Sequence, residues 1–290
     1  MIVKPYRFRG KEISMENDDR PVGQILSRRD ALKLLGVGRA AFLAACAAPN
    51  QSSTVVPTTE STLGSSPTTS ALDCVVRPEL TIGPYFVDDQ LNRSDIRTEP
   101  SDNSVKEGVP LTLAIGVFDV ANNSCTPLTD AQVDVWHCDA LGAYSGVSDQ
   151  GFDTTGQQFL RGYQLTDGTG KVQFLTIYPG WYSGRAVHIH FTIRTKAADG
   201  QDYQFTSQFF FDDALTDQVH AQEPYASKGQ RDTRNTSDNI FMGGGDQLLL
   251  DLQGDNTNGY TSTINIGLDL TDIEVGASDS AGGPGGGPPP

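Results

Sequence analysis

The sequence is poor in basic residues. It contains 21 Lys and Arg against 36 Asp and Glu, which gives a formal net charge of -15 at pH 7. The imbalance lies outside residues 1–46, because that segment carries more basic than acidic residues. A surface this acidic repels phosphate backbones, so nucleic acid is excluded as an expected partner. The acidity otherwise favours solubility and does not determine the fold.

Cysteine is also scarce. The chain has 4 cysteines and no Cys-x-x-Cys pair, so neither a zinc ribbon nor a thioredoxin-type site is predicted. If Cys46 is lipidated or removed, Cys74, Cys125 and Cys138 remain. One disulfide and one free thiol would then be the simplest outcome, and the sequence leaves all three pairings open.

The N-terminus lacks an apolar run long enough for a comfortable membrane helix, because the stretch at 34–48 is short and contains Arg39. Residues 27–33 (Ser-Arg-Arg-Asp-Ala-Leu-Lys) resemble a bacterial twin-arginine export signal. Residues 43–46 (Leu-Ala-Ala-Cys) resemble a lipobox, whose cysteine becomes lipidated. The alternative is ordinary cleavage after small residues, with Cys46 incidental. We expect an exported protein, in the periplasm, on the cell surface or outside the cell, with a membrane tether if Cys46 is lipidated.

Composition divides the chain into four segments. The export signal covers 1–46, and a linker rich in Ser, Thr and Pro covers 47–73. Residues 276–290 are rich in Gly and Pro and are predicted to be disordered, because they cannot bury a core. The remaining segment, 74–275, has the length of a typical single domain.

This central segment is predicted to be β-structure. Apolar residues alternate with small or polar ones, as in half-buried strands, at 111–120, 131–136, 171–177, 187–193 and 261–268. Turn signals separate these stretches, and long amphipathic helical patterns are few. Residues 213–240 are polar and irregular, which predicts a long loop with room for a helical turn. The pattern favours an all-β protein, a β-sandwich of mainly antiparallel strands with long loops.

Two of the 4 histidines form one pattern, His188-Ile189-His190. On a strand the side-chain period is two, so both imidazoles face one way and Ile189 faces the other. Two imidazoles arranged in this way can bind one metal ion. Alone, such a pair also fits two strand histidines that face solvent or each other.

A Pro/Gly-rich turn leads directly into that strand and brings Tyr182 and Arg185 close to the histidines. A bound cation deprotonates its ligands, and phenolate oxygen is a hard anionic ligand that suits a hard ion such as Fe(III). Imidazole accepts many metals, iron among them. Phenolates combined with imidazoles therefore indicate Fe(III) rather than Zn(II).

Two longer motifs resemble a known family. Residues 134–145 (Asp-Val-Trp-His-Cys-Asp-Ala-Leu-Gly-Ala-Tyr-Ser) are similar to the first metal-ligand motif of the intradiol ring-cleavage dioxygenases. Residues 174–182 (Phe-Leu-Thr-Ile-Tyr-Pro-Gly-Trp-Tyr), followed by 185–190 (Arg-Ala-Val-His-Ile-His), resemble the second. The family includes protocatechuate 3,4-dioxygenase and catechol 1,2-dioxygenase, and the resemblance covers about residues 74–270.

The resemblance implies one Fe(3+) per chain, held by Tyr144, Tyr182, His188 and His190, with Tyr144 equatorial and Tyr182 axial. It further implies catalytic roles for Arg185, beside the substrate ring, for Tyr182, as a proton acceptor, and for Gln208, in the pocket lining. The implied substrates are a catechol-type compound and O2, and the implied product is a cis,cis-muconate-type diacid. Gly83-Pro84-Tyr85 resembles a family segment near the pocket mouth, a weaker match.

The sequence departs from the best-known members at two points. It lacks the helical N-terminal dimerisation region of catechol 1,2-dioxygenases, and the spacing from Tyr182 to His188 is shorter than in protocatechuate dioxygenases. Both departures leave the identity of the catechol and the oligomeric state open.

Other residues compete for these roles. Tyr178 could replace Tyr182 as a ligand, while His137 is expected to form structural hydrogen bonds and His220 to be solvated. Asp134 and Asp139 are interpreted as turn and strand-edge residues rather than acid-base groups.

Two other kinds of protein remain possible. One is an exported, tethered, non-catalytic β-sandwich module that binds a ligand at the cell surface. The other is a zinc or copper enzyme built on the His-x-His pair, which would need a third ligand of another kind.

Overall fold

The computed structural model describes residues 74–121, 124–149 and 151–272. The predicted export signal, linker and tail, and with them Cys46, lie outside these residues. Within the described ranges no helix is long and apolar enough to cross a membrane.

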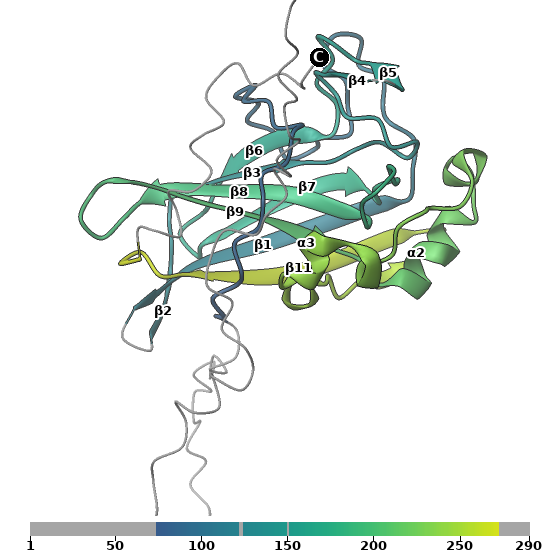
Figure 1. The fold of residues 1–290 in the computed structure, drawn as a ribbon. Coiled ribbons are helices and arrows are strands. Elements are labelled where there is room, and N and C mark those ends of the chain that lie inside the picture. The colour runs from purple at the N-terminus through teal and green to yellow at the C-terminus, as the bar shows by residue number, and fades with distance from the viewer. Residues whose placement is uncertain (1–73, 122–123, 150, 273–290) are drawn as a thin grey trace, which may run out of the picture. The chain divides into compact units, whose positions relative to one another are not determined.

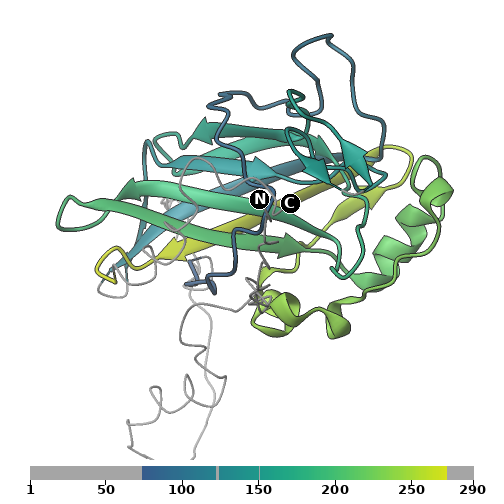
Figure 2. The same ribbon diagram turned by 45° about the horizontal axis from the view of Figure 1, so that its top comes forward.

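Two sheets form the framework, and Figures 1 and 2 show them as separate layers. The first sheet contains β1 (Pro110–Ala121), β2 (Ser124–Pro127), β7 (Lys171–Ile177), β10 (Gln253–Asp255) and β11 (Gly259–Leu268). Strand β1 pairs in parallel with β11, and the other pairs of this sheet are antiparallel.

The second sheet is antiparallel throughout. Its order is β6 (Arg161–Leu165), β3 (Gln132–Trp136), β8 (His188–Lys196) and β9 (Asp202–Phe210). A short hairpin of β4 (Ser148–Asp149) and β5 (Phe152–Asp153) stands apart from both sheets. The predicted strands at 111–120, 131–136, 171–177, 187–193 and 261–268 are all present.

One hydrophobic cluster joins the two sheets. Leu113 and Phe174 contribute from the first sheet, and Val133, Ile189 and Phe191 from the second, all of them fully buried. Alternate residues of each strand point into this cluster, because successive side chains of a strand point to opposite faces. The described part of the chain is therefore a β-sandwich of mainly antiparallel strands, and the predicted fold class is confirmed.

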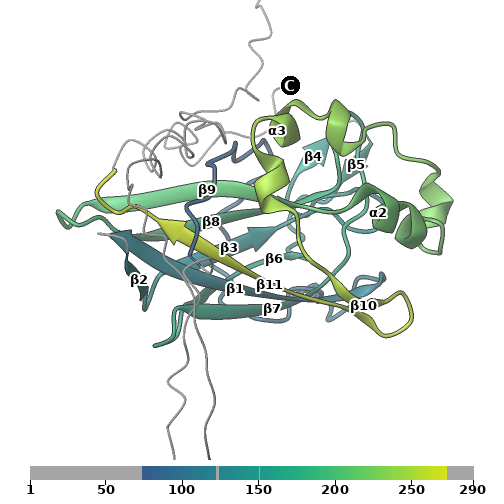
Figure 3. The same ribbon diagram turned by 90° about the horizontal axis from the view of Figure 1, so that it is seen from below.

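The segment between β9 and β10 is more ordered than predicted. The expected loop at 213–240 contains the helix α2 (Asp213–His220) and two short 3-10 helices, η1 (Tyr225–Lys228) and η2 (Asn235–Ser237). The short elements α3 (Asn239–Met242) and η3 (Gly245–Leu248) follow before β10. Asp212 caps α2, since its carboxylate accepts a hydrogen bond from the backbone N–H of Leu215. Figure 3 shows this segment beside one end of the two sheets.

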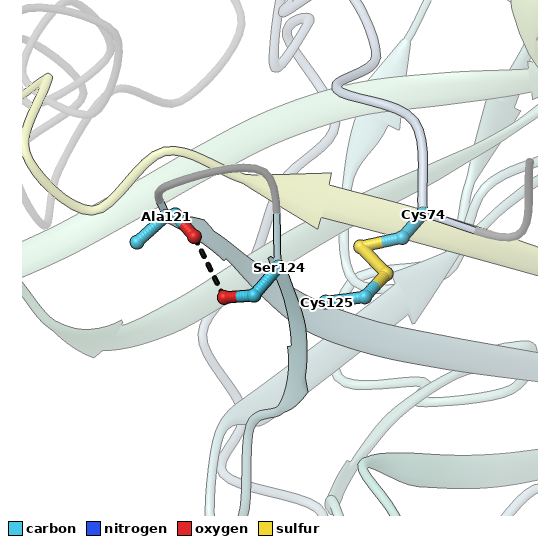
Figure 4. The surroundings of a disulfide bond; sticks show 4 residues. All are labelled: Cys74, Ala121, Ser124 and Cys125. Carbon is cyan, nitrogen blue, oxygen red and sulfur yellow. Dashed lines mark hydrogen bonds between the residues drawn. A yellow bond between two sulfur atoms is a disulfide. The ribbon is translucent and has the colours of Figure 1, made fainter. Parts of the chain in front are cut away.

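A disulfide joins Cys74 to Cys125, which lies on β2 (Figure 4). The backbone N–H of Gly267 on β11 donates to the carbonyl of Val75, so the start of the described chain runs beside that strand. Cys138 remains a buried free thiol. The structure thus selects one of the three pairings that the sequence left open.

Replacing both Cys74 and Cys125 with Ser is expected to lower the free energy of unfolding by about 2–4 kcal/mol, because the bond closes a long loop in the unfolded chain. The two residues are 51 apart in sequence. Urea unfolding monitored by fluorescence measures the loss, and reduced wild-type protein should match the variant. Peptide mapping without reductant should recover Cys74 joined to Cys125; a pair that contains Cys138 would contradict the structure.

Candidate metal centre

Three segments bring the four predicted ligands together. Tyr144 lies in the connection that follows β3, Tyr182 lies in the turn between β7 and β8, and His188 and His190 lie on β8 itself. Successive side chains of a strand point to opposite faces, so Ile189 and Phe191 enter the core while the two imidazoles point to the opposite side. Both faces of this part of β8 are buried.

The donor atoms of these side chains lie close together. The Nε2 atoms of His188 and His190 are 3.0 Å apart, and the hydroxyl oxygens of Tyr144 and Tyr182 each lie 3.4 Å from Nε2 of His188. Nitrogen and oxygen donors bind first-row metals at about 2.0–2.1 Å, so ligands of one ion lie about 3 Å apart. The observed separations match that spacing, and two phenols with two imidazoles suit ferric iron.

The tyrosines are essential to this donor set. Within the described ranges, no group of three or more His, Cys, Asp and Glu side chains is arranged to hold a metal ion. The zinc or copper enzyme considered above needs such a third ligand beside His188 and His190. The arrangement of these residues therefore favours an ion that accepts phenolate.

The tautomer of His188 follows from its surroundings. Its Nδ1 lies 2.6 Å from the carbonyl oxygen of Ala186, so Nδ1 carries the proton and donates it. The lone pair of Nε2 is then free to bind a metal. The His190 ring stacks on Trp136 with ring centroids 5.0 Å apart and planes 6° from parallel, which fixes its orientation.

Burial sets the protonation states of the centre. It lowers the pKa of His188 and of His190 well below the ordinary value, and the positive charge of Arg185 lowers both further. Burial also raises the pKa of Tyr144 well above its ordinary value, and the neighbouring Tyr182 raises it further. The imidazoles are therefore neutral, and the phenol of Tyr144 needs a bound cation to lose its proton.

Arg185 is held in a buried network. Its Nε donates to Oδ2 of Asp238 at 2.9 Å, and its second guanidinium nitrogen donates to Oε1 of Gln208 at 2.6 Å. Gln208 in turn donates to the carbonyl of Thr81 at 2.7 Å. Burial lowers the pKa of Arg185, but Tyr182 and Asp238 outweigh it, so the net shift is upward. The two predicted pocket residues, Arg185 and Gln208, thus form one unit.

Asp238 was not predicted as part of the site. Its Oδ2 accepts from the backbone N–H of Ala186 as well as from Arg185, and its Oδ1 caps α3 through the N–H groups of Ile240 and Phe241. It lies in the segment interpreted as an irregular loop, so no pattern in the sequence singled it out.

Glycines let the two tyrosine-bearing loops approach each other. A Cβ on Gly180 would lie 2.4 Å from the carbonyl oxygen of Ala140, closer than real contacts allow. The backbone N–H of Gly180 donates to the carbonyl of Asp139 at 3.1 Å. Gly83 has a φ of +72° and passes against the His190 ring, where a Cβ would lie 2.9 Å from Cε1. Only glycine fits these two positions.

Tyr85 completes the aromatic surroundings of the ligands. Its ring stacks on Tyr144 with centroids 4.4 Å apart and meets the edge of Tyr182 at 5.8 Å. Its hydroxyl donates to Asp149 on β4. Tyr85, which belongs to the segment with the weaker family resemblance, therefore packs directly against two of the proposed ligands, Tyr144 and Tyr182.

The competing residues have other partners. The hydroxyl of Tyr178 is hydrogen-bonded to Thr216 at 2.7 Å, and burial raises the pKa of Tyr178. Nε2 of His137 lies 2.6 Å from Oγ1 of Thr176, which is the structural hydrogen bond expected of it. His220 differs from expectation: it ends α2, binds the carbonyl of Pro179 at 3.0 Å, and stacks on Tyr225, so it is not simply solvated.

The two carboxylates singled out in the sequence differ in their surroundings. Asp134 lies on β3, and burial raises its pKa to about 6. Asp139 binds the backbone N–H groups of Leu141 and Ala143 and pairs with Lys106 at 2.8 Å.

A cavity of about 550 Å³ opens beside the centre. Tyr182 contributes to its wall together with Tyr85, Leu141, Asp149, Phe152 and Lys228. A small aromatic molecule could therefore reach Tyr182 from this side.

Comparisons with known proteins agree with this geometry. A family model described as dioxygenase matches residues 81–235. An intradiol ring-cleavage dioxygenase from Tetranychus urticae has a similar structure, with a TM-score of 0.59 and 29% identity, over 68% of this chain and 96% of that one. The structure of dioxygenase Tetur07g02040 is also similar, with a TM-score of 0.58 and 29% sequence identity, over 68% of this chain and 95% of that one. The chain belongs to the intradiol ring-cleavage dioxygenase family.

A curated relative supports the same assignment over a shorter length. The protocatechuate 3,4-dioxygenase beta chain of Burkholderia cepacia is 36% identical over 100 residues, which are 31% of this chain and 43% of the relative. The match thus spans less than half of that protein.

Replacing Asp238 with Asn is expected to destabilise the protein by about 3–5 kcal/mol, because it leaves the buried charge of Arg185 without its partner. The Arg185 and Asp238 side chains are 9% and 1% exposed. Thermal and urea unfolding measure the loss. The matched control is Asp202→Asn, whose pair with Lys196 is exposed and should cost less than about 1 kcal/mol. Equal losses in both variants would contradict a buried, charge-dependent network.

Proposed function

We propose that the protein is a non-haem Fe(III) dioxygenase that cleaves a catechol-type ring between its two hydroxyl-bearing carbons with O2, giving a cis,cis-muconate-type diacid. The observation that carries this proposal is that two phenol oxygens and the Nε2 atom of His190 all lie within 3.4 Å of Nε2 of His188. One ferric ion per chain would be held there by Tyr144, Tyr182, His188 and His190.

When bound, ferric iron would draw electron density from the catecholate and make the ring reactive toward O2. The chain's own residues would bind the substrate, accept its protons and stabilise its negative charge. Tyr182 lines the cavity and is only partly buried. With its phenol deprotonated by the bound cation, its oxygen would accept a proton from an incoming substrate hydroxyl and become a neutral phenol. Tyr144 is 1% exposed and remains as the fixed phenol ligand.

Arg185 supplies a fixed positive charge next to both phenols. Negative charge grows on the substrate as it loses its protons, and a cation already in position stabilises that charge without reorganising. Gln208 holds the guanidinium in place from one side and Asp238 from the other. We therefore assign Arg185 to charge stabilisation and Gln208 to its orientation at the pocket wall.

The proposal is tested by colour and oxygen uptake together. Purified protein that contains iron should absorb visible light through tyrosinate-to-iron charge transfer and should consume O2 with catechols. Tyr182→Phe should shift the absorption band and lower kcat by about 10²-fold, because it removes a ligand and a proton acceptor. Spectra, iron content and product absorbance measure these effects.

Tyr178→Phe is the matched control, since Tyr178 is buried nearby but bonded to Thr216. It should leave the band unchanged. Colourless protein with stoichiometric iron would contradict the phenolate ligands, and protein that binds no iron and consumes no O2 would favour the non-catalytic binding module.

We also propose that the protein is exported through the twin-arginine-like signal and tethered through lipidated Cys46. The Cys74–Cys125 disulfide supports this proposal, since disulfides persist in oxidising compartments. Attachment through the segment 47–73, which is rich in Ser, Thr and Pro, would place the dioxygenase domain where it meets small substrates outside the cytoplasm.

Replacing Arg28 and Arg29 with Lys should retain the protein in the cytoplasm with Cys74 and Cys125 reduced. Cell fractionation and thiol labelling in a bacterial host measure both outcomes. Cys46→Ser should release the protein from the membrane fraction without blocking export. Unchanged export of the twin-lysine variant would argue against this route.

A further inference from the structure

The cavity beside Tyr182 is larger than a bare catechol ring needs. Its volume of about 550 Å³ lies within the range of pockets that enclose drug-sized ligands, about 300–1,000 Å³. A ring placed against the ligands would leave the outer part of this space unfilled. The cavity therefore has room for a substituent on the ring.

The carboxylates that line the cavity are already engaged. Asp139 binds the ammonium of Lys106 and two backbone N–H groups. Asp149 accepts a hydrogen bond from the hydroxyl group of Tyr85.

Lys228 is the one Lys or Arg among the described residues that line this cavity. It ends η1, and its ammonium donates to the carbonyl of Leu141 at 2.5 Å and lies 4.9 Å from the centre of the Trp181 ring. The indole N–H of Trp181 donates to the carbonyl of Gly229 at 3.2 Å, which fixes the ring. Lys228 is thus oriented by neutral groups.

The charge of Lys228 is not matched by a close carboxylate. No Asp or Glu of the described ranges lies within 4 Å of its ammonium, whereas Lys106 and Lys196 each have such a partner. A lysine ammonium has three N–H donors, and one is used by Leu141. Two donors remain for an anionic group in the cavity.

We propose that Lys228 binds a carboxylate carried on the substituent of the catechol, so the preferred substrates are catechols with an acidic side chain. The inference rests on the proposed function, because it concerns the same cavity. It assigns Lys228 to substrate specificity and leaves the bond-breaking step to the metal centre.

The test compares an acid with its neutral ester. Iron-loaded protein is titrated without O2 with 3-(3,4-dihydroxyphenyl)propanoate and with its methyl ester, and calorimetry gives each Kd. Two further compounds are titrated in the same way: catechol, which has no carboxylate, and 3,4-dihydroxybenzoate, whose carboxylate is attached directly to the ring. They test whether the carboxylate must stand at the end of a side chain. Steady-state oxygen uptake gives kcat and KM for the same compounds.

Wild-type protein should bind the acid more tightly than the ester. Lys228→Met should raise Kd and KM for the acid about three- to ten-fold and leave those for the ester unchanged, the size expected for a partly exposed ion pair. Lys228→Arg should retain the preference for the acid. The control is Lys171→Met, because Lys171 is an exposed lysine at the start of β7. It should leave Kd and KM unchanged for both the acid and the ester.

Equal binding of acid and ester by wild-type protein would overturn the inference, as would equal weakening of both by Lys228→Met. These outcomes differ from failure of the proposed function, which would appear as absence of oxygen uptake with every catechol. Calorimetry would still report on Lys228 in that case, because it measures binding without turnover.

Discussion

The side-chain period of one buried strand is the constraint on which the rest of the site depends. Because successive residues of β8 point to opposite faces, Ile189 and Phe191 fill the core while His188 and His190 face the candidate metal centre. A shift of one residue in register would turn the imidazoles into the core and Ile189 and Phe191 toward the candidate metal centre. The packing of the sandwich therefore also sets the position of two ligands.

The loops around this strand bring the remaining groups close to the two imidazoles. Gly180 lets the loop of Tyr182 lie against the loop of Tyr144, and Gly83 lets the chain pass the edge of His190. Trp136 covers the face of His190 from the neighbouring strand, in register with it. These contacts orient the side chains of the proposed ligands, as the outer contacts of a metal site do.

Electrostatics in the centre are balanced for a cation that accepts anionic oxygen. Burial keeps both imidazoles neutral and holds the phenol of Tyr144 protonated. A trivalent ion would remove the phenol proton and offset the desolvation of the phenolate. Arg185 adds a second positive charge. The cost of burying this charge is offset by its ion pair with the buried carboxylate of Asp238.

The sequence by itself determined the fold class and the main strands, because the two-residue alternation of apolar and polar side chains is a local feature. The four proposed ligands, Tyr144, Tyr182, His188 and His190, were proposed from the resemblance of two motifs to a known family. The sequence could not determine that Cys74 pairs with Cys125, that His220 packs on Tyr225, or that Asp238 closes the network of Arg185. Those contacts join residues far apart in the chain, and no local pattern encodes such a distance. Only the tertiary structure decided them, together with the cavity that places Lys228 near the ligands, because burial and charge pairing arise when separate segments fold against each other.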